Sequence, residues 1–215
     1  MIGEHFVNKC LSTDTGMEPW PYQEIEDSFP EDFFAKFNES CHHLLDFDGF
    51  RTGDKKNTSY DGPVPFHVYP KDFDKFNINL YNEVEDIAKT ILPKAKDLCM
   101  KINPRHRWFS KLGVNAHISI TPPLPYKFHI HQETGDKIWS AVTYVTPEKN
   151  VGTKMYTREK AESFVKEAKW KPNSTFIFCG ENGKTWHSYE SDQASNRITF
   201  NLFIMKPNKY TFYHG

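Results

Sequence analysis

Short segments of alternating apolar and polar residues fill the second half of this chain, and they limit its fold more than any other feature. Such alternation places successive side chains on opposite faces of an extended strand. Turn-forming stretches rich in proline, glycine and asparagine separate the segments. Residues 158–169 are charged and predict a short helix inserted between strands. We predict strands over residues 111–120, 126–132, 137–145, 153–157, 174–178, 186–189 and 197–205.

The first half of the chain has helical periodicity instead. Residues 28–32 are a good helix start, with proline in the first turn and two acids after it. The clearest helical period spans residues 77–102, where Pro93 should kink or restart the helix. Residues 1–27 are polar and contain prolines, which predicts an extended edge strand, and residues 46–75 predict a long loop.

Helices followed by many short strands predict a mainly β fold. We expect two antiparallel sheets facing each other, a jelly roll or double-stranded β-helix, buttressed by N-terminal helices. At 215 residues the chain suits one domain. In that domain, 1–215, residues 28–102 would form the helical support and residues 108–206 the jelly-roll core.

Composition narrows the classes of partner. Lysine and arginine (27) nearly balance aspartate and glutamate (28), so no net basic field favours nucleic acid. The four cysteines are scattered, which disfavours a zinc ribbon or a disulfide framework. No long apolar run could span a membrane, and the N-terminus lacks the layout of a signal peptide. We therefore expect a soluble, intracellular, cytoplasmic protein with no membrane partner.

Three side chains in the strand-rich half could bind a metal ion. A strand places residues i and i+2 on one face, so His131 and Glu133 can both point inward. The residues between Glu133 and His187 suffice for about four strands with turns, which brings the chain back to the same site. Two imidazoles and one carboxylate can occupy one face of an iron(II) octahedron and leave the other positions open. His131, Glu133 and His187 are thus candidate metal ligands and catalytic residues.

Arg197 and Thr199 follow His187 by ten and twelve residues. A fixed guanidinium with a neighbouring hydroxyl can hold the carboxylate of an acidic cosubstrate. An inward-facing arginine in a partly desolvated pocket needs an anion. We assign Arg197 and Thr199 to cosubstrate binding and add Tyr126 as a further candidate. Other candidates for lining the pocket are Asn115, His117, His129, Lys137, Tyr144 and Asn201.

His129 offers an alternative metal site, because His129 and His131 are themselves a same-face pair. Ligation by His129, His131 and His187 would make a cupin-like centre for zinc or another divalent ion. The downstream Arg197 and Thr199 favour the set that contains Glu133, since a cupin has no need for them.

Parts of the sequence between His131 and Thr199 resemble those of a known family. The resemblance rests on three runs, HQETGDKIWSAVTYV at 131–145, NVGTKMY at 150–156, and His187 with RIT at 197–199. These runs are similar to those of the 2-oxoglutarate and Fe(II)-dependent oxygenase superfamily, nearest to its prolyl-hydroxylase-like and phage- or bacterium-encoded branches. The family has an HxD/E pair, a distal histidine and an arginine about ten residues later. Glu133 stands where aspartate is commoner.

The resemblance implies an Fe(II)- and 2-oxoglutarate-dependent dioxygenase. By it, His131, Glu133 and His187 would bind iron, and Arg197 would pair with the distal carboxylate of 2-oxoglutarate. Its cofactors would be Fe(II), 2-oxoglutarate and O2, with succinate and CO2 as coproducts. Hydroxylation of an unactivated C–H bond is the expected outcome, because the carboxylate at Glu133 leaves no room for the halide of the halogenating variants.

The substrate stays open at this point. Candidates are a protein side chain, an amino acid or a small metabolite, so the partner would be a small molecule or a peptide, with nucleic acid disfavoured. Two alternatives also stay open: the cupin-like metal protein and a non-catalytic module that binds 2-oxoglutarate without turnover. Sequence does not indicate the oligomeric state.

Overall fold

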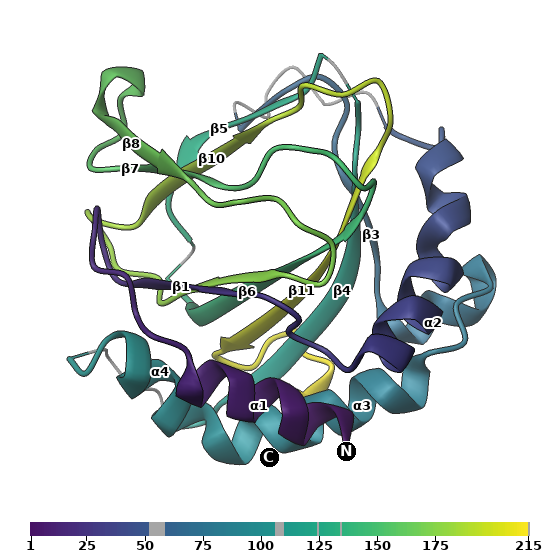
Figure 1. The fold of residues 1–215 in the computed structure, drawn as a ribbon, viewed down its shortest axis with the longest axis horizontal. Helices are drawn as coiled ribbons and strands as arrows, with labels where there is room; N and C mark the ends of the chain where they lie inside the picture. Colours follow the sequence, from purple (N-terminus) through teal and green to yellow (C-terminus); the bar gives the residue numbers. More distant parts are fainter. Residues whose placement is uncertain (52–58, 106–109, 124, 134, 215) are drawn as a thin grey trace.

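Two antiparallel sheets form the centre of the molecule (Figure 1). The structure is a computed structural model and describes residues 1–51, 59–105, 110–123, 125–133 and 135–214. The larger sheet has the order β1 (Tyr22–Ile25), β9 (Thr175–Phe178), β6 (Lys137–Thr146), β11 (Arg197–Met205), β4 (Gly113–Thr121) and β12 (Tyr213–His214), with β3 (Phe66–Val68) also paired to β4. The smaller sheet has the order β2 (Tyr60–Asp61), β5 (Lys127–His131), β10 (Trp186–Glu190), β7 (Lys154–Tyr156) and β8 (Phe164–Glu167).

The chain alternates between the two sheets from β4 to β11. β4, β6, β9 and β11 belong to the larger sheet, whereas β5, β7, β8 and β10 belong to the smaller one. This winding is compatible with the predicted jelly roll, although both sheets are open at their edges. The mainly β character and the antiparallel sheets are as predicted from the alternating segments.

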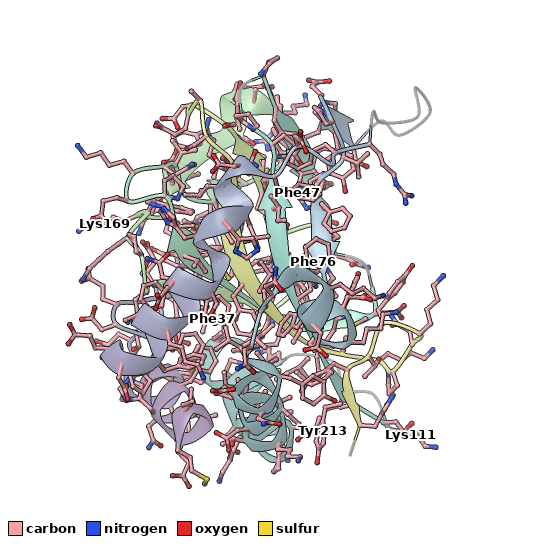
Figure 2. All side chains as sticks on the ribbon, turned by 90° about the vertical axis from the view of Figure 1, so that its right-hand side faces the viewer. Phe37, Phe47, Phe76, Lys111, Lys169 and Tyr213 are labelled. Atoms are coloured by element: carbon pink, nitrogen blue, oxygen red, sulfur yellow. The ribbon has the colours of Figure 1, made fainter. Side chains whose placement is uncertain are left out.

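Four helices cover one face of the larger sheet (Figure 1). They are α1 (Ile2–Ser12), α2 (Glu31–His42), α3 (Tyr81–Ile91) and α4 (Ala95–Ile102), accompanied by the 3-10 turns η1 (His43–Asp46), η2 (Pro70–Phe76) and η3 (Leu92–Lys94). A further 3-10 turn, η4 (Ala161–Ser163), lies between β7 and β8 of the smaller sheet. Phe37 of α2 packs on Phe200 of β11, with ring centroids 5.1 Å apart, and Figure 2 shows α2 in front of the strands. Within the described residues, no helix combines the length and apolar character needed to cross a bilayer.

β11 contributes side chains to both faces of the larger sheet. Its even-numbered residues from Ile198 to Ile204 are buried in the core shared with the helices. Its odd-numbered residues from Arg197 to Phe203 line a cavity between the sheets. The period of two in a strand is the cause. The helices therefore support the larger sheet from one face, while its opposite face lines the cavity.

Residues 2–12 correct the prediction of an extended N-terminal segment. They form α1, which buries Phe6, Val7 and Cys10 at helical spacing. α1 approaches α3 so closely that a β-carbon on Gly3 would lie 2.5 Å from Thr90 Oγ1. Only the latter part of the predicted segment is extended, as the edge strand β1. The helical support therefore begins well before residue 28.

Three other regions can be compared with their predictions. The helix over residues 77–102 is confirmed as α3 and α4, with Pro93 in the 3-10 turn between them. The helix predicted over residues 158–169 is wrong, because residues 164–167 pair with β7 as β8. The described part of residues 46–75 contains β2, β3 and η2, while residues 52–58 lie outside the described residues, as does Trp108, where the strand-rich half was predicted to begin.

Asn173 joins the start of α2 to the larger sheet. Its side-chain amide exchanges two hydrogen bonds with the backbone of Phe29, each 3.0 Å long. Its backbone is left-handed, with φ 63°, a conformation in which a β-carbon is disfavoured but asparagine is tolerated. The residue thus combines a buried link with an unusual backbone.

We expect Asn173→Ala to lower the free energy of unfolding by about 3 kcal/mol, because two buried hydrogen bonds are lost and their partners stay buried. Asn173→Gly should recover about 1 kcal/mol of this loss, since glycine accepts the left-handed backbone. Urea unfolding of the three proteins measures both effects. An alanine variant as stable as the wild type would contradict the proposed link.

Candidate active site

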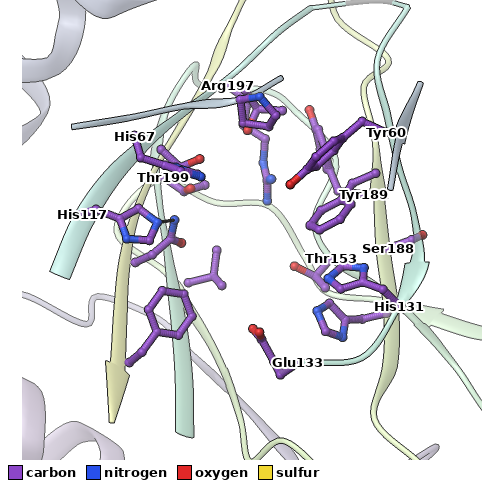
Figure 3. Close-up of a pocket in the computed structure, with 18 of the residues that line it drawn as sticks. Tyr60, His67, His117, His131, Glu133, Thr153, Ser188, Tyr189, Arg197 and Thr199 are labelled. Carbon is purple, nitrogen blue, oxygen red and sulfur yellow. Dashed lines mark hydrogen bonds between the residues drawn. The ribbon is translucent and has the colours of Figure 1, made fainter. Parts of the chain in front are cut away.

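A cavity of about 340 Å³ lies between the two sheets (Figure 3). β4, β6 and β11 supply one wall, and β5 and β10 supply the opposite wall. His131, Glu133, His187, Arg197, Thr199 and Tyr126 all line it, so the structure brings every predicted site residue to one cavity. Its volume lies within the usual range for small-molecule sites, about 300–1,000 Å³.

His131 and His187 lie side by side on neighbouring strands of the smaller sheet. They are paired in register on β5 and β10, and their ring centroids lie 4.2 Å apart. Nδ1 of His131 donates to the carbonyl of His129 at 2.8 Å, and Nδ1 of His187 donates to the carbonyl of Thr185 at 2.9 Å. A carbonyl can only accept, so each Nδ1 carries the proton and each Nε2 keeps its lone pair, the arrangement found in metal-ligating histidines.

Both imidazoles are held neutral. Burial lowers the pKa of His131 to about 3, and the neighbouring His187 adds to the effect. Burial also lowers the pKa of His187. Because metal binding needs the neutral ring, neither side chain has to lose a proton at neutral pH before it can act as a ligand.

Glu133 lies just beyond the end of β5 and is 10% exposed. Oε2 is 2.8 Å from Nζ of Lys137, and Oε1 accepts a hydrogen bond from Ser140 Oγ at 3.1 Å. Burial raises the pKa of Glu133, but Lys137 and His187 outweigh it and lower the pKa to about 2. The carboxylate is therefore ionised, and Figure 3 shows Glu133 on the same side of the cavity as His131.

The three candidate ligands fit a divalent metal in chemistry but are not assembled around one point. In the part of the chain that the structure describes, no three His, Cys, Asp or Glu side chains form a metal-sized cluster. The carboxylate of Glu133 contacts Lys137 and Ser140 instead. Two neutral nitrogen donors and an ionised carboxylate remain a donor set that suits iron(II).

His129 does not belong to the site. Three residues of β10, from His187 to Tyr189, lie opposite four residues of β5, from His131 to Phe128, so β5 carries a bulge. The extra residue places Phe128 and His131 in the cavity wall. His129 is outside that wall, with Nε2 3.0 Å from Oδ2 of Asp61. The alternative metal set built on His129 therefore loses its geometric basis.

Arg197 carries a buried positive charge that forms no ion pair within the described part of the chain. Arg197 is 6% exposed. Its Nε and Nη2 atoms are buried without a hydrogen-bond partner among the described residues. The guanidinium stacks over Tyr189 at 3.9 Å from the ring centroid, with Trp170 at 5.2 Å and Tyr144 at 5.5 Å. Aromatic faces attract a cation but do not satisfy its N–H groups. The unpaired N–H groups of this guanidinium could therefore donate to an anionic ligand.

Thr199 and Tyr126 lie beside this cation. Thr199 follows Arg197 by two residues on β11 and is buried in the same wall. Tyr126 precedes β5, is also buried, and its ring lies 6.1 Å from that of Tyr189. Burial raises the pKa of Tyr126, so its hydroxyl keeps its proton and can donate. Together the three side chains can offer several donors to one carboxylate.

Comparison with known proteins finds solved structures with a similar fold. The chain matches a prolyl hydroxylase from Trichoplax adhaerens, solved with a hypoxia-inducible-factor peptide, with TM-score 0.58 and 11% identity over 94% of this chain and 88% of that one. It matches a Pseudomonas putida prolyl-4-hydroxylase with TM-score 0.54 and 13% identity over 96% and 100%. A non-heme alpha-ketoglutarate-dependent carbocyclase of nogalamycin biosynthesis matches with TM-score 0.55 and 14% identity over 96% and 86%.

The chain has the fold of the 2-oxoglutarate-dependent oxygenases. The resemblance stated from the sequence is thus confirmed at the level of fold. No protein-family model matches the sequence, and a search of curated proteins finds no significant match either.

Several residues of this oxygenase fold were missed in the sequence. Tyr189 and Trp170 flank Arg197, and His67, Phe128 and Phe203 line the cavity. Tyr189 could have been found, since it lies two residues from His187 on one strand. Phe203 could have been found in the same way, since it shares a face of β11 with Arg197, Thr199 and Asn201. Trp170 in a loop, His67 on the short strand β3 and Phe128 on the bulged strand β5 gave no such signal. Among the candidate liners, His117, Lys137 and Asn201 do line the cavity, whereas Asn115 and Tyr144 lie outside its wall.

We expect His117 to make the stability of this fold depend on pH. The residue is 8% exposed, and burial lowers its pKa well below the usual 6.5. The unfolded chain therefore takes up a proton below about pH 6.5 while the folded protein does not, so stability is full above that pH and falls below it.

We expect the wild type to lose about 2 kcal/mol more unfolding free energy than His117→Gln when the pH falls from about 6.5 to about 5. Urea unfolding at several pH values measures the difference. Parallel pH profiles for the two proteins would show that His117 is protonated in the folded state and would refute the prediction.

Proposed function

We propose that this protein is an Fe(II)- and 2-oxoglutarate-dependent dioxygenase that hydroxylates an unactivated C–H bond. The observation that carries the proposal is the buried, unpaired guanidinium of Arg197 in the same cavity as His131, His187 and Glu133. A site with a metal-binding donor set and a separate cation suits a cosubstrate that offers a chelating group at one end and a carboxylate at the other. The oxygenase fold supports the same conclusion.

His131, His187 and Glu133 would hold the iron. The backbone carbonyls at His129 and Thr185 keep both imidazoles in the ligating tautomer. The carboxylate of Glu133 would have to exchange part of its contact with Lys137 for the metal. When bound, iron, 2-oxoglutarate and O2 supply the oxidising power, with succinate and CO2 as coproducts.

Arg197, Thr199 and Tyr126 would bind the distal carboxylate of 2-oxoglutarate. The guanidinium can donate two parallel hydrogen bonds to it, while the hydroxyls complete its shell. The rings of Tyr189 and Trp170 fix the guanidinium and exclude water from it. This end of the cavity would therefore position the cosubstrate, and the remaining volume would take a small molecule or the side chain of a peptide.

The test is aerobic turnover with purified protein. We expect Fe(II) and 2-oxoglutarate together, added with pooled amino acids, peptides and cell extracts, to yield succinate above the level seen without iron. Anaerobic Fe(II) and 2-oxoglutarate should also give a weak visible charge-transfer band, as the family resemblance implies. Absence of both would sink the proposal. Binding of 2-oxoglutarate without succinate from any pool would favour the non-catalytic module instead.

A further inference from the structure

Three charged side chains line the cavity within the described part of the chain. Arg197 and Lys137 are cations and Glu133 is the anion. The buried imidazole of His117 adds no charge at neutral pH. A divalent metal and doubly charged 2-oxoglutarate would cancel each other, so the loaded cavity would keep one uncompensated positive charge. Isolated charge in a partly desolvated site is costly unless a ligand neutralises it.

In the loaded cavity the uncompensated charge would fall on Lys137 rather than on Arg197. Nζ of Lys137 lies 3.9 Å from the ring centroid of Phe203 and 2.8 Å from Glu133. Residues 197 and 203 are six positions apart on β11, about 20 Å along the strand. Arg197 would take the distal carboxylate of 2-oxoglutarate, whereas the negative charge beside Lys137 would be shared with the metal. The ammonium is then left with only part of its counter-ion.

The surroundings of Lys137 suit a ligand group. Asn201 donates from Nδ2 to Nε2 of His117 at 3.2 Å, and Nδ1 of His117 donates to Asn115 Oδ1 at 3.1 Å. These hydrogen bonds fix the uncharged side chains of Asn201, His117 and Asn115. The ring of His117 lies 5.5 Å from that of Phe203. Lys137 itself is 26% exposed. A ligand can therefore reach the ammonium, and it would then lie beside Glu133.

We propose that Lys137 binds a carboxylate of the primary substrate, so that the substrate is a small carboxylic acid held against Phe203 and next to the metal ligands. The inference rests on the proposed function and names its substrate class. The ammonium would form a charge-assisted hydrogen bond to the acid, and the neutral wall of His117 and Asn201 would border the rest of the molecule. Lys137 is thus a specificity-determining residue in addition to a counter-ion for Glu133.

The test measures binding by calorimetry to the protein loaded with Mn(II) and 2-oxoglutarate. The probes are L-amino acids, hydroxy acids and aromatic acids, each paired with its carboxamide. We expect at least one acid to bind, with its amide about tenfold weaker or more because one charge-assisted bond is lost. Lys137→Gln should remove this preference to within about twofold, and Lys137→Arg should keep it.

The matched control is Lys154→Gln. Lys154 has similar exposure, 25%, and pairs with Glu190 at 3.4 Å, but it does not line the cavity. This variant should keep the preference for acids. Mn(II) affinity, measured in every variant, separates a loss of substrate recognition from a change at Glu133.

Three results would overturn the inference: amides that bind as well as acids in the wild type, a preference that persists in Lys137→Gln, or no binding by any acid. In each case intact Mn(II) and 2-oxoglutarate binding would leave the proposed function standing. Failure to bind Mn(II) or 2-oxoglutarate would instead count against the proposed function itself.

Discussion

Arg197→Met should weaken 2-oxoglutarate binding by about a hundredfold or more. Truncating one partner of a buried charge pair typically costs about 2–5 kcal/mol, and Arg197 is the cation without an anion in the described cavity. Methionine keeps much of the side-chain volume between the surrounding rings, so the loss would report the charge. Calorimetry with Mn(II)-loaded protein measures the affinity directly.

The same substitution should act on stability in the opposite direction. The wild-type protein without ligand holds a buried guanidinium with unsatisfied Nε and Nη2 atoms, and replacing such an ion by an apolar residue often stabilises a fold. We expect the unfolding free energy of the ligand-free variant to rise by about 1 kcal/mol. A variant that is both weaker in binding and more stable cannot be dismissed as misfolded.

Arg158→Met is the control for this pair of effects, because Arg158 is exposed. It should change neither 2-oxoglutarate affinity nor stability by a measurable amount. Wild-type affinity in Arg197→Met would remove the observation on which the proposed function depends.

His131→Ala should abolish metal-dependent succinate formation and reduce Mn(II) affinity by about a hundredfold or more. Substituting groups that only orient a ligand already costs about 10–100-fold, and here a ligand itself would be lost. Its Nε2 is the donor that the hydrogen bond at Nδ1 leaves available. Electron paramagnetic resonance of free Mn(II) gives the affinity, and succinate release gives the turnover.

His129→Ala is the matched control on the same strand. Its imidazole pairs with Asp61 outside the cavity, while its carbonyl, which the alanine retains, accepts the bond from His131. Metal affinity and turnover should both survive. Loss of metal binding in His129→Ala with retention in Glu133→Ala would reverse the assignment and restore the cupin-like set.

The sheet and its inward-facing side chains could be predicted because their signal is local. Alternation along residues 197–205 decides which side chains share a face, whatever the strand packs against. The ten-residue interval between His187 and Arg197 pointed to these two site residues, since each lies on a strand that the alternating pattern had already predicted. Periodicity thus predicted the strands and their faces, whereas the choice of site residues among the inward-facing side chains also used the resemblance to the oxygenase family.

What could not be predicted depends on contacts between distant segments. α1 is short, and its apolar side chains, such as Phe6, Val7 and Cys10, pack on segments that are distant in the sequence. The prediction treated residues 1–27 as one proline-containing extended segment and so missed this helix. Residues 164–167 form a strand because β7 offers them an edge. The outward turn of His129 comes from one extra residue in β5 relative to β10. The ion pair of Glu133 with Lys137 joins residues only four positions apart. It could not be predicted because it depends on where β5 ends, at His131.

The bonds at Nδ1 of His131 and His187 have one further consequence, because both acceptors are main-chain oxygens of residues 129 and 185. No substitution of the side chains at those two positions deletes an acceptor. The hydrogen bonds that orient the two imidazoles therefore do not depend on which side chains occupy positions 129 and 185. An alanine scan would pass over both positions without revealing what they hold in place.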